Sequence, residues 1–252
     1  MANRIDRCAE TFPKLFERPP VTNEGKDPEF MKVMQRYIFG DIWHAGPLDE
    51  RMRGLCEIAA MTARHTLPAL KNHIRSAFNA GCTALEIREA VYQCAPFTGF
   101  PHVMEALVVM NEVFEEKGLE IPLHSDEEMI PEEDRLSVGE ERMASMTAED
   151  LTDRFHDFPA PYDEILPYML SAYGFGDFTG RGILSIKERS LLILIILTAS
   201  DTPGLLKPFA EGYLKSGGTS EEILCALVQA SPYMGLARLL GALEEIRDLL
   251  IV

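Results

Sequence analysis

The chain has 252 residues, of which 46% are hydrophobic and 25% are charged, the composition of a globular protein long enough to bury a full core. Its formal net charge of -16 would repel nucleic-acid phosphates and anionic membrane surfaces, so neither is an expected partner. The first residues lack an apolar signal core. The longest apolar run, Leu191 to Leu197, is far shorter than the roughly 20 residues that span a bilayer. We therefore expect a cytoplasmic protein.

The sequence contains itself twice, with the second copy displaced by 136 residues. Pairing residues 37–107 with residues 173–243 gives 23 identical positions out of 71, without a gap. Self-similarity at a fixed offset indicates two equivalent structural units. We predict a first repeat over residues 1–120, an acidic linker over residues 121–140 and a second repeat over residues 141–252.

Each repeat is expected to be a bundle of helices. An amphipathic stretch, Arg4 to Phe16, precedes the first copy, and residues 141–155 precede the second. Apolar residues at spacings of three and four between Leu48 and Thr62 predict the next helix. Pro68 suits the first turn of a further helix, which we expect to stop at Gly81.

A capping box marks the start of the third helix in both copies. Thr83 is followed three residues later by Glu86, and Thr219 is followed in the same way by Glu222. We expect these helices to bend or end at Pro96 and Pro232, since proline lacks a backbone donor. A last helix is predicted over residues 101–117, matched by residues 237–251.

Two segments are open to other interpretations. The run Leu191 to Leu197 has the composition of a buried strand, but its counterpart in the first copy is helical in pattern, so a buried helix is predicted. Gly174-Phe175-Gly176 is interpreted as a structural turn, because its counterpart is Ile38-Phe39-Gly40.

The five cysteines show neither zinc-type spacing nor a disulfide framework, so no metal site is predicted. Most are expected to be small buried hydrophobic residues. Cys56 and Cys94 lie in apolar segments of the first copy, and the second copy replaces them with Leu192 and Ala230.

Three kinds of polar residue on apolar helix faces are candidates for chemistry. His73 is either a hydrogen-bonded core histidine or a general acid or base. Gln93, kept in the second copy as Gln229, either caps nearby backbone or binds a ligand. Arg53 is also kept in the second copy. It either pairs with Asp41 or clamps a substrate carboxylate.

The pattern of these residues resembles the carboxymuconolactone decarboxylase family, an all-helical family that includes alkylhydroperoxidase-type disulfide reductases. The resemblance covers about 80 residues of the first copy and, more weakly, about 80 of the second. It is carried by Phe39-Gly40-Asp41-Ile42-Trp43, Arg53, His73-Ile74-Arg75, Gly81-Cys82-Thr83, Glu86 to Ala90 and Gln93 to Pro101. It implies an all-α fold of two fused helical-bundle repeats.

The resemblance also separates two branches of chemistry. The redox branch needs two cysteines and a glutamate, at positions that here hold Thr66, Ala69 and Gly54. Without the dithiol that chemistry has no nucleophile. The decarboxylase branch lacks the cysteines and keeps the tryptophan, arginine, histidine and glutamine that this chain has. It acts without metal or organic cofactor on a carboxylated lactone.

By that resemblance, the catalytic residues are expected to be His73 as proton donor, Gln93 as donor to the oxyanion and Arg53 as carboxylate ligand. The expected substrate-binding residues are Trp43 and Phe97 as walls, together with Asp41 and Arg181. Arg181 supplies, in the second copy, an arginine that the first copy lacks at Ala45. The family resemblance further implies a homo-oligomer, here a trimer with pseudo-six-fold symmetry.

The sequence thus favours a cofactor-free lyase acting on a small carboxylated lactone or related acid. Two alternatives remain: an antioxidant protein using an isolated cysteine, and a binding or assembly protein that kept the fold without catalysis. Because His73 and Trp43 occur only in the first copy, any reactive centre is expected there.

Overall fold

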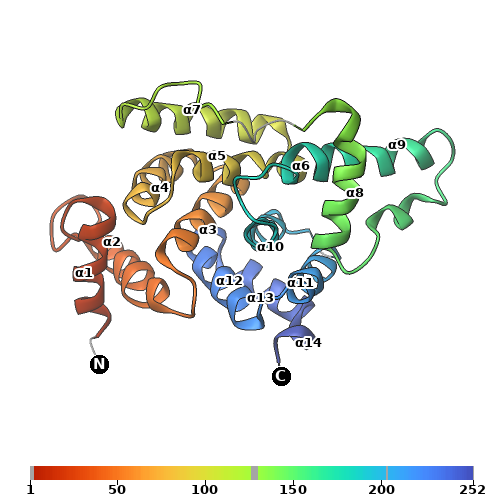
Figure 1. Ribbon diagram of the computed structural model, residues 1–252. Helices are drawn as coiled ribbons and strands as arrows, with labels where there is room; N and C mark the ends of the chain where they lie inside the picture. The colour runs from red at the N-terminus through yellow and green to blue at the C-terminus, as the bar shows by residue number, and fades with distance from the viewer. Residues whose placement is uncertain (1–2, 126–129, 203, 252) are drawn as a thin grey trace.

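A computed structural model describes residues 3–125, 130–202 and 204–251, and all its regular elements are helices (Figure 1). The first repeat contains α1 (Arg4–Phe16), α2 (Pro28–Gln35), η1 (Arg36–Asp41), η2 (Ile42–His44), α3 (Glu50–Ala63), α4 (Leu67–Asn79), α5 (Ala84–Tyr92), α6 (Ala95–Thr98) and α7 (Phe100–Glu116). The second contains η3 (Glu132–Asp134), α8 (Arg135–Met146), η4 (Leu151–Phe155), α9 (Tyr162–Tyr168), η5 (Met169–Asp177), α10 (Ile186–Ser200), α11 (Leu206–Lys215), α12 (Ser220–Met234), α13 (Leu236–Glu245) and α14 (Arg247–Leu250). This confirms the predicted all-α class. None of the described helices is long and apolar enough to cross a bilayer.

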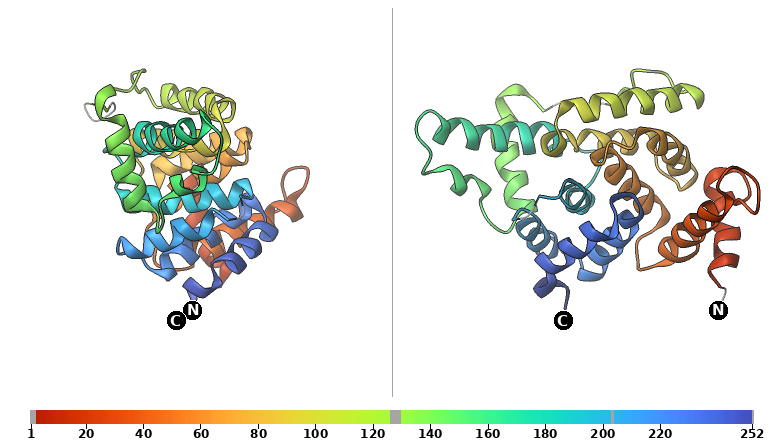
Figure 2. Two further views of the ribbon diagram at one scale, coloured as in Figure 1. Left: turned by 90° about the vertical axis from the view of Figure 1, so that its right-hand side faces the viewer. Right: turned by 180° about the vertical axis from the view of Figure 1, so that it is seen from behind.

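Helices α1 and α2 lie at one end of the molecule, and α9 lies at the other (Figures 1 and 2). Helix α8 begins at Arg135, so the last part of the segment expected to be linker is helical. It packs on η5 as α1 packs on η1.

Glycines allow both of these contacts to be close. A Cβ on Gly40 would collide with the backbone oxygen of Arg4, and one on Gly176 would collide with that of Arg135. The prediction that Gly174-Phe175-Gly176 forms a turn is therefore wrong. These residues belong to the π-helix η5, where Gly176 allows helix α8 to pack closely. Both copies keep the dipeptide Phe-Gly, as Phe39-Gly40 and Phe175-Gly176, because in each copy the glycine lies against the backbone of a neighbouring helix.

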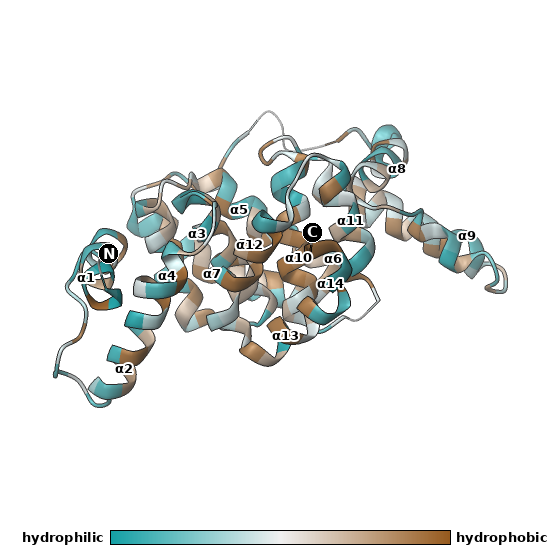
Figure 3. Ribbon diagram, turned by 90° about the horizontal axis from the view of Figure 1, so that it is seen from below, coloured by the Kyte–Doolittle hydropathy of each residue, from teal (hydrophilic) through white to brown (hydrophobic). Residues whose placement is uncertain are grey.

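The two repeats share one core. Helix α10, which contains the predicted buried helix Leu191 to Leu197, is buried along nearly its whole length and lies in the middle of the molecule (Figure 3). It packs against α3 of the first repeat, and α3 also packs against α12 of the second. One hydrophobic cluster therefore contains residues of both repeats.

The predicted capping boxes at Thr83 and Thr219 are both present, and Ser185 forms a third. The prolines behave differently in the two copies. In the first, α5 ends at Tyr92 and α6 begins at Ala95, whereas α12 continues through Pro232 to Met234. Pro232 has no N–H to donate to the carbonyl oxygen of Val228. The hydroxyl of Ser231 donates to that oxygen at 2.8 Å instead, so the helix tolerates the proline.

An ion-pair clasp joins the repeats at the starts of α3 and α10. Arg51 lies 2.6 Å from Glu86 of the first repeat and 2.7 Å from Glu188 of the second. Burial acts to raise the pKa of both glutamates, but hydrogen bonds from Arg51 and from the capping residues outweigh it and lower the pKa of each.

Candidate active site

A buried glutamate and a histidine form the centre of the candidate site. Glu57 lies on α3 and is 1% exposed, and its Oε2 is 2.7 Å from Nδ1 of His73 on α4. The His73 side chain is 12% exposed, so the dyad reaches solvent through the imidazole. Nε2 of His73 makes no hydrogen bond to any residue that the structure describes.

The second repeat supplies two more donors to the same carboxylate. On α12, which packs against α3 (Figure 1), Gln229 donates from Nε2 to Glu57 Oε1 at 2.9 Å, and the Tyr233 hydroxyl donates to the same oxygen at 2.7 Å. Burial, and then the Glu57 charge, raise the pKa of Tyr233 well above its usual value, so its hydroxyl stays protonated.

These contacts define the tautomer of His73. An ionised carboxylate only accepts hydrogen bonds, so Glu57 accepts from Gln229, from Tyr233 and from the Nδ1–H of His73. The other ring nitrogen, Nε2, then carries the lone pair when the imidazole is neutral and a proton when it is charged. With Nδ1 bound to Glu57, Nε2 is the ring nitrogen that can give or take a proton, which makes the dyad suited to proton transfer there.

Aromatic side chains wall the histidine. The Phe16 ring of α1 lies edge-on to His73 with 5.4 Å between centroids, and the Tyr233 ring lies edge-on at 5.0 Å. Phe16 and Tyr233 also pack against a small apolar cluster that contains Phe39 and Trp43. Trp43 is 4% exposed and its indole N–H has no described hydrogen-bond partner.

Arg53 has no donor left for a substrate. Its guanidinium donates to the backbone oxygens of Leu48, Ile42, Ala45 and Gly46 and, at 3.1 Å, to Oε1 of Gln229. A guanidinium has five N–H donors, so all are committed. Arg53 thus holds the segment after η2 in place and orients Gln229, whose amide nitrogen is thereby turned toward Glu57.

A second, related centre is built from the equivalent positions of the other repeat. Arg189 of α10 donates at 3.5 Å to Gln93 of the first repeat, just as Arg53 donates to Gln229. Each centre therefore takes its arginine from one repeat and its glutamine from the other. Each repeat thus supplies its glutamine to the arginine of the other repeat, as expected for two units related by a pseudo-two-fold axis.

The second centre lacks the dyad. The positions of Glu57, His73 and Tyr233 hold Ile193, Phe209 and Phe97 there, and the Phe97 and Phe209 rings pack edge-on at 6.2 Å. Phe175 stacks on Phe209 from the other side. Where the first centre has the Glu57–His73 pair, the second is filled with aromatic rings.

A buried ion cluster stabilises this second centre. Glu89, with no exposed surface, accepts from Arg181 Nε at 3.0 Å to each oxygen and from Arg189 at 2.9 Å. The Arg181 guanidinium also lies over the Tyr92 ring. The Glu89 carboxylate is thus fully engaged by buried arginines, which leaves it committed to the packing of this centre.

The structure divides the residues predicted from sequence. His73, Arg53 and Trp43 lie around the first centre. Gln93, Phe97 and Arg181 lie at the second, because the glutamine-bearing helices cross over between repeats. Asp41 lies in neither centre.

The shared aspartates pair with the first helix of each repeat. Asp41 accepts from Arg7 at 3.2 Å, and Asp177 forms two hydrogen bonds of 2.6 Å with Arg135. The salt bridge between Arg53 and Asp41, one of the two interpretations of Arg53, is therefore not formed, and Asp177 likewise pairs with Arg135 rather than with Arg189. Each aspartate instead ties α1 or α8 to the adjacent π-helix.

Sequence reasoning missed Glu57, Gln229 as a partner of the first centre, and Tyr233. Glu57 did leave a signal, because it is a carboxylate one turn after Arg53 in an otherwise apolar run and its counterpart is Ile193. Tyr233 differs from its counterpart Phe97 by one hydroxyl. Only the packing of α12 on α3 shows that this hydroxyl serves the other repeat.

The cysteines do not provide a nucleophile. All five are buried in the described structure, and burial raises the pKa of Cys8, Cys56, Cys82 and Cys94, that of Cys82 to about 12. A raised pKa leaves little reactive thiolate near neutral pH. No three His, Cys, Asp or Glu side chains come together as possible metal ligands in residues 3–125, 130–202 and 204–251.

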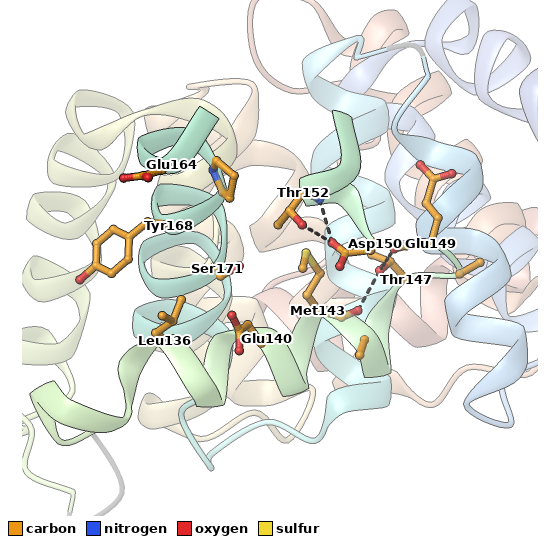
Figure 4. Close-up of a pocket in the computed structure, with 13 residues that line it drawn as sticks. Leu136, Glu140, Met143, Thr147, Glu149, Asp150, Thr152, Glu164, Tyr168 and Ser171 are labelled. Carbon is orange, nitrogen blue, oxygen red and sulfur yellow. Dashed lines mark hydrogen bonds between the residues drawn. The ribbon is translucent and has the colours of Figure 1, made fainter. Parts of the chain in front are cut away.

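A groove of about 780 Å³ lies on the second repeat between α8 and the helical stretch of α9 and η5 (Figure 4). Its charged lining residues are all acidic: Glu140, Glu149, Asp150 and Glu164. Such a lining would repel a carboxylate. The dyad, rather than this groove, is the better candidate for chemistry on an organic acid.

Comparison with known proteins agrees with this fold. The sequence profile described as "Carboxymuconolactone decarboxylase family" matches residues 28–112 and 166–248, once in each repeat and over more than half of the chain. This chain belongs to the carboxymuconolactone decarboxylase family. The two matches confirm the tandem arrangement of family units.

Two curated relatives are decarboxylases by name. The chain is 30% identical over 91 residues to 4-carboxymuconolactone decarboxylase of Acinetobacter baylyi, covering 36% of this chain and 68% of that protein. It is 31% identical over 98 residues to nitrosuccinic acid decarboxylase npaB of Metarhizium robertsii, covering 39% of this chain and 65% of the relative.

One solved structure matches nearly the whole chain. It is a protein of Burkholderia xenovorans provisionally assigned as a gamma-carboxymuconolactone decarboxylase subunit, with 20% identity and a TM-score of 0.52. The match covers 97% of this chain and 96% of that one. At this identity the likeness supports the tandem fold of the family, and the chemistry rests on the residues of the first centre.

Proposed function

We propose that this protein is a carboxy-lyase that acts on a small carboxylated lactone or a related organic acid, at one centre per chain. The observation that carries the proposal is the Glu57–His73 dyad, which leaves Nε2 of His73 as the site of proton transfer. The two decarboxylase relatives support the reaction class.

The reaction that fits the dyad is loss of carbon dioxide followed by protonation of carbon. The bond between the substrate carbon and its carboxylate breaks, carbon dioxide leaves, and the electron pair moves onto an oxygen of the conjugated acceptor, which is the lactone carbonyl in a carboxylated lactone and the nitro group in nitrosuccinic acid. The resulting carbanion-equivalent carbon then takes one proton from His73 Nε2, and solvent reprotonates the imidazole.

The other residues of the first centre have supporting roles. Glu57 orients the imidazole, while Tyr233 and Gln229 donate to the Glu57 carboxylate and hold it in place. The unpartnered indole N–H of Trp43 is the donor that we assign to the developing oxyanion, in place of Gln93. Phe16 and Phe39 exclude water from the reacting face.

The proposal is tested by measuring carbon dioxide release from 4-carboxymuconolactone and from nitrosuccinic acid. We expect His73→Ala to lower kcat by a factor of about 10² to 10⁴, the usual contribution of a positioned acid or base. His156→Gln, at an exposed histidine paired with Asp153, is the matched control and should retain full activity. Full activity of His73→Ala would remove the dyad from the reaction, and no release from either acid by the folded protein would refute these substrates.

A further inference from the structure

A basic pocket lies one aromatic ring away from His73. It has a volume of about 380 Å³ and is formed where the ends of α1 and α7 meet one side of α4. Helix α4 lies between the other two (Figure 1). The lining residues are Leu15, Phe16, Glu17, Arg18, Asn72, Arg75, Asn79 and Lys117.

The lining is positive in a protein that is otherwise strongly acidic. Three cations, Arg18, Arg75 and Lys117, stand against one lining carboxylate, Glu17, whereas the whole chain carries a net charge of -16. Arg75 is held by Glu116 at 2.7 Å. Arg18 and Lys117 form no ion pair with any described residue, so their charges remain available to a ligand.

Both available cations rest on aromatic faces. The Arg18 guanidinium lies 5.7 Å from the centre of the Phe12 ring, and the Lys117 ammonium lies 5.6 Å from that of Phe78. Contacts of this kind restrain flexible side chains and lower the entropy lost when they bind an anion. The two cations follow the ends of different helices, and therefore suit a ligand with more than one carboxylate.

Phe16 connects this pocket to the dyad. Its ring lines the pocket and also lies edge-on to the His73 imidazole at 5.4 Å. Phe16, which is partly buried, is therefore the residue that the pocket and the His73 imidazole share.

We propose that this pocket binds small polycarboxylates and delivers them past Phe16 to His73. The delivery step rests on the function proposed above, whereas the binding step does not. Two positive charges in a concave site attract and orient a polycarboxylate, and they favour it over a monocarboxylate.

The test is calorimetric titration of the full-length protein with tricarballylate at low salt. Arg18→Gln/Lys117→Gln should weaken binding at least about tenfold. The control Lys26→Gln/Arg247→Gln removes the same charge from exposed sites elsewhere and should change binding less than about twofold. Acetate should bind far more weakly than tricarballylate. If the double variant unfolds, the two single variants take its place.

Several results would overturn the proposal: no binding by the wild type, equal losses in both double variants, or binding of pyrophosphate as tight as that of tricarballylate. A double variant with a lower Tm and unchanged binding would show that the two cations only cap their helices. His73→Gln should keep the affinity. If the wild-type protein binds tricarballylate but shows no decarboxylase activity, the proposed reaction is contradicted while the polycarboxylate pocket is supported.

Discussion

Replacing Glu57 with glutamine tests the dyad without changing the shape of the site. An amide offers one acceptor oxygen and one NH₂ group, whereas the carboxylate accepts on both oxygens. The amide oxygen can still accept from Gln229 and Tyr233, so the NH₂ group faces Nδ1 of His73. That contact requires the lone pair on Nδ1 and the proton on Nε2, the reverse of the tautomer in the native site.

The magnitude follows from this reversal. In a histidine dyad, the wrong tautomer and the lost countercharge lower kcat by about 10³ to 10⁴. The number of hydrogen bonds is kept and only their charge assistance is lost, so we expect a stability loss of about 1–2 kcal/mol. For a protein of this size that corresponds to a fall in Tm of about 2–8 °C.

The assay is carbon dioxide release at saturating substrate together with thermal unfolding. The matched control is Glu89→Gln in the second centre. It leaves Arg181 and Arg189 without their buried countercharge, which should cost about 3–5 kcal/mol while activity is retained below Tm. Activity of Glu57→Gln within about threefold of the wild type would refute the assigned role of the dyad. Equal activity losses in the two variants would refute the functional asymmetry of the repeats.

Three further outcomes are expected. Tyr233→Phe, which copies the second centre, should lower stability by about 1.5–3 kcal/mol and reduce kcat, because the Glu57 carboxylate loses one donor; an unchanged Tm would contradict the hydrogen bond. Arg51→Met should cost about 1–2 kcal/mol at pH 7 in urea unfolding. Folding lowers the pKa of Glu86 and Glu188, so the clasp stabilises the protein fully above their unfolded pKa of about 4.5. This stabilisation is lost as the pH falls through the folded pKa values, so the stability of the variant should approach that of the wild type near pH 3. The exposed apolar residues Met104 and Leu240 occupy equivalent positions on α7 and α13, and aspartate at both should convert the proposed trimer to monomers in light scattering; an unchanged mass would place the interface elsewhere.

Local features of the fold were predictable because neighbouring residues encode them. Helix α1 begins and ends where its amphipathic pattern does, and the capping boxes at Thr83 and Thr219 mark true helix starts. The predicted helix end is confirmed near Pro96, whereas α12 continues two residues past Pro232 before it ends. Pro232 stays inside α12 because Ser231 satisfies the carbonyl that the proline leaves free, a contact that a proline rule by itself does not consider.

The composition of the site was less predictable. His73 was identified from its place on an apolar face, and it remains the centre of the proposal. Gln93 was grouped with it because both lie in the first copy, yet Gln229 occupies that position in space. Sequence distance cannot show which of two equivalent helices packs against α3. The redox branch's glutamate position is Gly54 in this chain, so no carboxylate was predicted beside His73, whereas Glu57 stands one turn further along the same helix.

The sequence by itself determined the two family repeats, their helices and the asymmetry between them, because caps, periodicity and internal identity are properties of short segments. It also determined that only the first copy carries a histidine and a tryptophan at these positions. Only the tertiary structure decided that each centre is assembled from both repeats. Packing α12 on α3 brings Gln229 and Tyr233 to a carboxylate more than 170 residues away in the chain, and that contact depends on the shared core rather than on any local pattern.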